Sequence, residues 1–276
     1  MVAKSLVNHV FGPYVLRQVI GGGATAEVWR AEHHCDHRPV AVKILREELL
    51  RDRFHQRNFL KEQELLGEIS HPGIPRLRHQ GDLQGRPAFA MDFIPGASLA
   101  EVIKQPGLPR QRALLELCDV VGYLHEQDVV HNDLKLDNVL WRSAGGLVLI
   151  DYGSIRRVGT MREITSMILR EPVRVFNTPT YIAPELIAGK KATKASDCYA
   201  LGVCAFILLS GQPPYLDKNQ SGKLRAHATA QPPSILERIK GFPPNQARTI
   251  DGCLAKDPAD RPVIAELITA VRSLAR

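Results

Sequence analysis

The chain has 276 residues, 44% of them hydrophobic and 24% charged, and a formal net charge of +7. This length is enough for one large domain or two closely packed lobes, and the composition is that of an ordinary soluble globular protein. Lysines and arginines are scattered among acidic residues. The positive excess therefore favours a solvated basic surface over nucleic-acid binding.

Neither a secretion signal nor a membrane span is expected. The N-terminus lacks a continuous apolar segment before a small-residue cleavage site, and the longest apolar run, at 199–209, is far shorter than the roughly twenty residues that a bilayer requires. The cysteines are odd in number and widely spaced, which favours reduced thiols and a cytoplasmic location. They are Cys35, Cys118, Cys198, Cys204 and Cys253.

The first part of the chain has the pattern of a β-sheet. Alternating or β-branched stretches predict strands at 14–20, 26–32 and 39–45, and residues 77–94 predict a hairpin that turns at Gln84-Gly85. One helix is predicted between them, at 53–69.

Helical patterns prevail after the composition break at residues 95–99. Short strands are predicted in VVHND, NVLW and LVLI, and the predicted helices are 111–127, 197–210, 234–240, 246–255 and 262–275. The chain is therefore predicted to be an α+β protein with a small antiparallel β-sheet lobe, which carries one main helix, and a larger, mostly helical lobe.

Three stretches carry candidate chemistry. In IGGGATAEV (20–28), glycines between two strands would let backbone N–H groups approach phosphates, although a plain hairpin turn is the commoner explanation. In VAVK (40–43), Lys43 closes an apolar strand. Glu62 lies on the apolar stripe of the following helix, where a carboxylate needs a cationic partner, and Lys43 is the natural candidate. A solvent-facing lysine on an edge strand and a solvated Glu62 at the rim of the stripe are the alternatives.

The third stretch is HNDLKLDN (131–138). Asp133, Lys135 and Asn138 lie on a tight loop and suit a base, a charge stabiliser and a metal ligand. Asp151 ends the apolar strand LVLI and precedes a glycine. A carboxylate and an amide brought together form an oxygen-rich site that suits Mg²⁺.

These motifs, in this order, resemble a eukaryotic-type (Hanks-type) serine/threonine protein kinase domain of the kind also found in bacteria. GGGATAEV resembles the glycine-rich loop, VAVK the ATP lysine strand, HNDLKLDN the catalytic loop, DYG the metal motif and TPTYIAPE the segment before the substrate lobe; SDCYALG and DPADRP resemble later structural motifs. The resemblance spans residues 14–274. It implies a single kinase domain over 1–276, with an N-lobe (1–91), a hinge (92–96), a C-lobe (97–276) and an ATP cleft between the lobes.

The resemblance also implies the cofactors and the residue roles. ATP and Mg²⁺, or Mn²⁺ in its place, would be the cofactors, and serine or threonine hydroxyls of proteins, or of the chain itself, would accept the phosphoryl group. Lys43, held by Glu62, would bind the phosphates. Asp133 would accept or orient the substrate proton and Lys135 would offset charge, while Asn138 and Asp151 would bind the metal. The other implied ATP-binding residues are Ile20, Gly21, Gly22, Gly23, Ala24, Val28, Ala41, Met91, Asp92, Ile94 and Leu140.

Structural roles follow from the same resemblance. Glu185 and Arg261 resemble a buried ion pair. Asp197 resembles a residue that braces the catalytic loop, with a simple N-cap as the alternative. The activation segment would include Thr160, Thr165, Ser166, Thr178 and Thr180.

The chain departs from the family pattern at three positions. Ala26 replaces the third loop glycine, and Tyr152 replaces a phenylalanine, so that its hydroxyl needs a partner. Asn132 stands where most members have an arginine that pairs with a phosphorylated activation loop, and asparagine cannot form that charge pair. In this respect the chain resembles the non-RD class, whose members often need no loop phosphorylation. Nearby arginines that could replace the missing one are Arg156, Arg157, Arg162, Arg170 and Arg174.

Other interpretations remain beside this one. A pseudokinase that binds nucleotide and acts as a scaffold is the main alternative, because intact motifs do not prove turnover. HHCDH (33–37) contains zinc-type ligands, although consecutive residues rarely surround one ion tetrahedrally. The sequence indicates no particular substrate protein, activator or oligomeric state.

Overall fold

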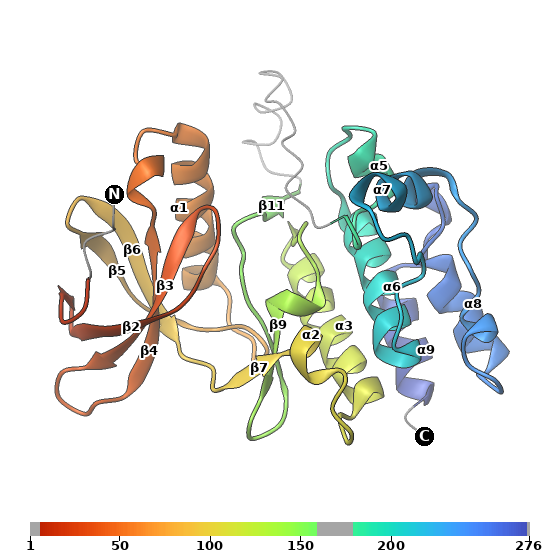
Figure 1. Cartoon of the computed structure of the whole chain (residues 1–276), viewed down its shortest axis with the longest axis horizontal. Helices are drawn as coiled ribbons and strands as arrows, with labels where there is room; N and C mark the ends of the chain where they lie inside the picture. Colours follow the sequence, from red (N-terminus) through yellow and green to blue (C-terminus); the bar gives the residue numbers. More distant parts are fainter. Residues whose placement is uncertain (1–5, 159–178, 275–276) are drawn as a thin grey trace. The chain divides into compact units, whose positions relative to one another are not determined.

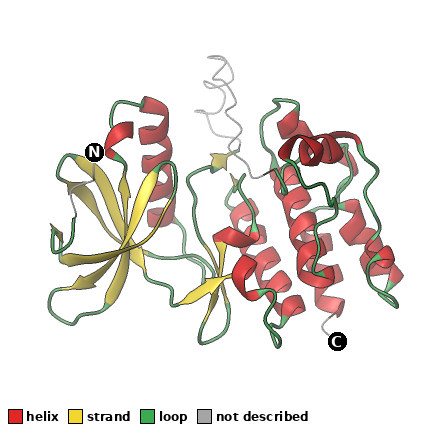
Figure 2. Cartoon of the chain, in the orientation of Figure 1, coloured by secondary structure: helices red, strands yellow, loops and turns green. Residues whose placement is uncertain are grey.

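The computed structural model describes residues 6–158 and 179–274. The chain divides into two compact units, Met1–Pro95 and Gly96–Arg276, with the division inside the segment 92–96. The first unit is an antiparallel β-sheet with one main helix and the second is mostly helical (Figures 1 and 2), which confirms the predicted fold class.

The sheet of the first unit has the strand order β1-β2-β3-β4-β6-β5, with every neighbouring pair antiparallel. Its strands are β1 (Val10–Phe11), β2 (Tyr14–Gly22), β3 (Ala26–His33), β4 (Pro39–Leu45), β5 (Leu77–Leu83) and β6 (Arg86–Asp92). Gln84 and Gly85, the predicted turn between β5 and β6, both have positive φ. This conformation closes a two-residue hairpin with the twist that its strands require.

Helix α1 (Arg53–Glu68) has Asp52 as its N-cap, and the Asp52 side chain accepts hydrogen bonds from the backbone N–H groups of Phe54 and His55. One face of the helix is buried. Phe59 on this face lies 5.1 Å, centroid to centroid, from Phe89 on β6. A single 3-10 turn, Glu47–Leu49, precedes the helix.

The second unit is built around α6, which is buried on nearly all sides, as expected for an apolar helix in a core. Helices α3, α8 and α9 pack with it into one bundle (Figure 2). The helices are α2 (Leu99–Val102), α3 (Arg110–Glu126), α5 (Pro184–Ile187), α6 (Lys194–Ser210), α7 (Gln220–Thr229), α8 (Pro244–Gly252) and α9 (Ile264–Leu274). The strands are β7 (Gly96–Ser98), β8 (Val129–Val130), β9 (Val139–Arg142), β10 (Leu147–Leu149) and β11 (Arg156–Arg157). Single 3-10 turns lie at Leu136–Asn138, Ile235–Glu237 and Pro258–Asp260.

One helix prediction in this unit was wrong, and helices α2, α5 and α7 were not predicted. The helix predicted at 234–240 is only the turn Ile235–Glu237, because Gly241 has a φ of 74° and Pro243 follows two residues later. Helix α7, which was not predicted, is mostly polar. Within the part of the chain that the structure describes, no helix has both the length and the apolar character needed to cross a membrane.

Candidate active site

The predicted ion pair between Lys43 and Glu62 is present in the first unit. Lys43 Nζ lies 2.8 Å from both carboxylate oxygens of Glu62, and the two residues are only 7% and 2% exposed. Strand β4 lies between β3 and β6, so Lys43 is not on an edge strand. Glu62 is likewise buried and not at a solvated rim. Both alternatives weighed from the sequence are therefore wrong, and the ammonium group is held in place.

The glycine-rich stretch forms the end of β2 and its turn into β3. A Cβ atom added at Gly21 or Gly23 would meet no described atom within 4 Å, and neither residue has a positive φ. Neither packing nor backbone conformation thus requires glycine at these positions, whereas close approach by a ligand would. Arg46, which sequence reasoning missed, donates from Nε to the Gly23 carbonyl at 2.8 Å, and its backbone N–H donates to Thr25 O.

The other implied ATP-binding residues of this unit lie on the same sheet or follow it directly. Val28 on β3 is in register with Lys43 on β4, and Ala41 on β4 is in register with Met91 on β6. The remaining members are Ile20 and Gly22 on β2, Ala24 in the turn, Asp92 at the end of β6 and Ile94 beyond it. Leu140 belongs to β9 of the second unit.

In the second unit, the catalytic-loop residues converge on one carboxylate. Lys135 Nζ lies 2.7 Å from Asp133 Oδ2. Asn138 donates from Nδ2 to the same oxygen at 3.1 Å and to the Asp133 carbonyl at 2.9 Å. Burial raises the pKa of Asp133 above its ordinary value, and the hydrogen bond from Lys135 opposes this shift. The predicted loop therefore brings a carboxylate, an ammonium group and an amide together.

Asp151 is tied to this loop through the backbone. The neighbouring Ile150 N–H donates to the Asn138 carbonyl at 2.8 Å, so the two expected metal ligands come from hydrogen-bonded segments. Tyr152 is buried, and its hydroxyl donates to the Leu149 carbonyl at 3.0 Å. This is the partner that a tyrosine at that position was expected to need.

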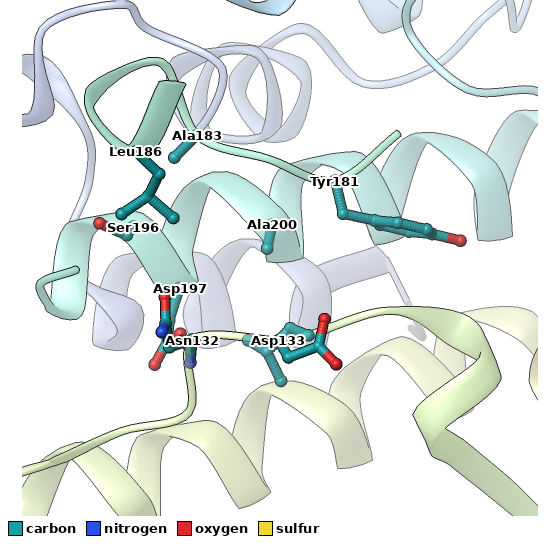
Figure 3. A pocket seen from close by; sticks show the side chains of 9 residues that line it. Asn132, Asp133, Tyr181, Ala183, Leu186, Ser196, Asp197 and Ala200 are labelled. Carbon is teal, nitrogen blue, oxygen red and sulfur yellow. Dashed lines mark hydrogen bonds between the residues drawn. The ribbon is translucent and has the colours of Figure 1, made fainter. Parts of the chain in front are cut away.

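Asp197 holds the backbone of the same loop. Its carboxylate accepts hydrogen bonds from the backbone N–H of His131 at 2.8 Å and of Asn132 at 2.9 Å, and His125 Nε2 lies 2.9 Å away. Helix α6 begins at Lys194, so Asp197 lies inside its first turn and the N-cap alternative is wrong. Figure 3 shows Asp197 beside Asn132, at a cavity of about 10 Å³ that Asp133 also lines.

Asn132 has a φ of 66°, a left-handed conformation that asparagine tolerates better than most residues. Its Nδ2 donates to the Ser154 carbonyl at 3.2 Å. The side chain therefore connects the loop to the segment that follows Asp151, and it adds no charge to the loop.

The ion pair between Glu185 and Arg261 is bidentate and buried. The guanidinium nitrogens lie 2.8 and 2.7 Å from the two carboxylate oxygens, and Ser196 Oγ donates to the same carboxylate at 2.6 Å. Arg261 also donates to the carbonyls of Ala255 and Ala195. The prediction of this pair is confirmed.

A second buried polar cluster was missed from the sequence. Tyr199 OH lies 2.8 Å from His227 Nδ1, and Lys256 Nζ donates to Tyr215 OH at 2.8 Å. Burial lowers the pKa of His227 to about 4, and Lys223 Nζ on α7 donates to Thr180 Oγ1 at 3.4 Å. The cluster connects α6 and α7 to Thr180. The other expected activation-segment residues, Thr160, Thr165, Ser166 and Thr178, lie outside the described residues, as do Arg162, Arg170 and Arg174.

Known proteins are similar to this sequence over nearly its whole length. Residues 14–271 match the family described as protein kinase domain. The serine/threonine-protein kinase PkaA of Streptomyces coelicolor is 33% identical, over 98% of this chain and 51% of that protein. The serine/threonine-protein kinase PknJ of Mycobacterium tuberculosis is 30% identical over 95% of this chain and 45% of its own length. PrkC of Bacillus subtilis, also a serine/threonine-protein kinase, is 30% identical over 94% of this chain and 40% of its own length.

The chain thus spans about half of the length of these relatives, or less. The family match covers far more than half of this chain and agrees with the fold and with the order of its motifs. The chain belongs to the protein kinase domain family and is homologous to bacterial serine/threonine-protein kinases.

Proposed function

We propose that this chain is an active serine/threonine protein kinase domain, which transfers the γ-phosphoryl group of ATP to hydroxyl groups of protein substrates and of the chain itself. The observation that carries the proposal is the arrangement around Asp133, whose carboxylate is contacted by the Lys135 ammonium and the Asn138 amide. A nucleotide-binding scaffold would not need a base and a cation in contact at this loop.

Asp133 acts on the acceptor hydroxyl. Its carboxylate orients the hydroxyl and accepts its proton, and the pKa raised by burial makes it a stronger proton acceptor than an ordinary aspartate. Lys135 places positive charge next to this reaction, where negative charge has to be offset. Asp197 holds the backbone next to Asp133, so the positioning of the Asp133 carboxylate supplies much of the rate of phosphoryl transfer.

The residues present fit ATP and a divalent metal, which the family implies. Asn138 and Asp151 offer amide and carboxylate oxygens, the donors preferred by Mg²⁺, and Mn²⁺ accepts the same donors. The Asn138 Nδ2 faces Asp133, which turns the amide oxygen away from that carboxylate. A metal held by these residues would offset the negative charge of the phosphate oxygens. Lys43, fixed by Glu62, is placed to hold phosphate oxygens, and Gly21 and Gly23 leave room for them.

We further propose that the chain belongs to the non-RD class and is active without phosphorylation of its activation segment. Asn132 cannot pair with a phosphate as an arginine would, and its amide already donates to Ser154 O. A variant with three alanines should therefore keep its activity. A fall of more than about a hundredfold, roughly 2.7 kcal/mol in barrier height, would refute this. The replaced residues are Thr160, Thr165 and Ser166.

The first test is intact-mass spectrometry of phosphatase-treated protein incubated with ATP, Mg²⁺ and a generic basic substrate protein. Asp133→Asn is the matched control, because it keeps the size of the side chain and removes the base. We expect phosphate to be added in the wild type and not in Asp133→Asn, and site mapping to find phosphoserine and phosphothreonine. ATP binding without phosphate transfer in the wild type would favour the scaffold instead.

A further inference from the structure

The turn between β3 and β4 gathers three side chains of metal-ligand type. One ligand atom each of His33, His34 and Cys35 lies within 4.8 Å of the other two. Ligands of a tetrahedral Zn²⁺ lie about 3.3–3.6 Å apart, so modest side-chain rotation would bring these atoms onto one ion. The His37 N–H donates to the His33 carbonyl at 3.0 Å, which folds the chain back on itself. Because of this turn, the side chains of consecutive residues can point toward a single ion.

Both histidines are oriented by partners at Nδ1. His33 Nδ1 lies 3.1 Å from an Asp36 carboxylate oxygen, and His34 Nδ1 lies 2.9 Å from the Pro13 carbonyl. Such partners place the ring proton on Nδ1 and leave Nε2 as the nitrogen with a lone pair, which is the usual arrangement around metal-bound histidines. The Cys35 N–H approaches His33 Nδ1 at a longer 3.4 Å. The charged carboxylate is nearer and is the stronger partner.

An ion can reach this turn from solvent. Cys35 is exposed, whereas the other four cysteines are buried, and His34 is also exposed. The turn lies at the opposite end of β3 from Ala26 and the glycine-rich stretch, roughly 23 Å along an eight-residue strand. Metal at the turn would therefore not touch the glycine-rich stretch at the other end of the strand.

We propose that His33 and His34, through Nε2, and Cys35, through its thiolate, bind one Zn²⁺ at this turn, with a water molecule as the fourth ligand. Binding converts the Cys35 thiol to a thiolate and releases one proton to solvent for each ion bound, without any change of oxidation state. Asp36 and the Pro13 carbonyl are positioning groups that orient the two imidazoles.

The test uses the full chain without an affinity tag, freed of metal by a chelator and titrated with Zn²⁺ by calorimetry. One ion should bind per chain, and Zn²⁺ should protect Cys35 from alkylation, which is read by peptide mass spectrometry. Cys35→Ser and His34→Gln should each weaken binding by more than about tenfold, and Asp36→Asn by about tenfold or more. His37→Gln is the matched control from the same turn and should bind as the wild type does.

A peptide of residues 31–38 tests whether the fold builds the site. It has the same ligands but lacks Pro13, so the folded chain should bind Zn²⁺ more tightly. Equal affinity of chain and peptide would overturn the proposal, as would a wild-type Kd weaker than about 0.1 mM. Unchanged binding by Cys35→Ser, or a loss confined to His37→Gln, would also overturn it.

Discussion

The buried pair of Glu185 and Arg261 leads to an asymmetric stability prediction. Breaking a buried ion pair costs about 3–5 kcal/mol, because the remaining charge has no partner. In Glu185→Gln, Arg261 keeps the carbonyls of Ala255 and Ala195 and an amide oxygen, so we expect a cost near the lower value, about 3 kcal/mol. In Arg261→Met, Glu185 keeps only the Ser196 hydroxyl among its described side-chain partners, and we expect about 5 kcal/mol.

The assay is urea unfolding followed by tryptophan fluorescence. The chain has two tryptophans, Trp29 in the first unit and Trp141 in the second. A Trp29→Phe background makes the signal specific to the unit that contains the ion pair. This matters because units that unfold separately would not give a single two-state transition.

Two further measurements test whether an unpaired buried charge causes the loss of stability. The double variant Glu185→Gln with Arg261→Met should be more stable than Arg261→Met alone, because it leaves no unpaired buried charge. Acidification from pH 7 should reduce the cost of Arg261→Met, because burial without the arginine raises the pKa of Glu185 and the carboxyl group becomes neutral. Losses below about 1 kcal/mol in both single variants, or a larger loss in Glu185→Gln, would refute the reasoning.

Three other predictions concern single residues. Arg46→Gln should raise the KM for ATP about five- to tenfold, because the contact with the Gly23 carbonyl is lost; an unchanged KM in an ATP titration would contradict this. The kcat should fall as the pH drops through the raised pKa of Asp133, because only its ionised form accepts a proton, and a profile that is flat down to about pH 4 would exclude this role. Burial holds the pKa of His227 at about 4 in the folded chain, whereas its ordinary value in the unfolded chain is near 6.5. Between these pH values only the unfolded chain takes up the proton. Acidification through this range should therefore lower the free energy of unfolding by up to about 3 kcal/mol. Thermal unfolding across this range should show less pH dependence in His227→Gln, and an equal dependence in both proteins would contradict the assignment.

Much of the fold could be predicted because hydrophobic periodicity is a local signal. The strands predicted at 26–32 and 39–45 agree with β3 and β4 to within one residue, and the helix predicted at 53–69 is α1. Helix α7 was missed because its mostly polar residues give no apolar stripe. Its N-cap, Asn219, whose side chain accepts from Gly222 N–H, was the available signal.

The site was only partly predictable, for a different reason. The pairing of Lys43 with Glu62 could be predicted because an unpaired carboxylate on a buried helix face has a high free-energy cost. The predicted contact of Asp197 with the catalytic loop is confirmed, and the N-cap alternative arose from an error in the helix boundary. With the helix expected to begin at residue 197 it could be an N-cap, but with the helix beginning at Lys194 it faces the catalytic loop. The contact between Arg46 and Gly23 and the cluster around His227 leave no periodic pattern in the sequence, because only tertiary packing brings these residues together.

The hydrogen bonds between Asp197 and the backbone of the catalytic loop have a consequence for how related kinase domains can diverge. Its carboxylate binds the backbone N–H groups of His131 and Asn132, which every amino acid except proline possesses, and it does not bind the Asn132 side chain. A mutation at position 132 can therefore change what the loop responds to while Asp133, next to it, stays in place. Under the proposed function, regulation and chemistry would depend on adjacent residues, and each could change without the other.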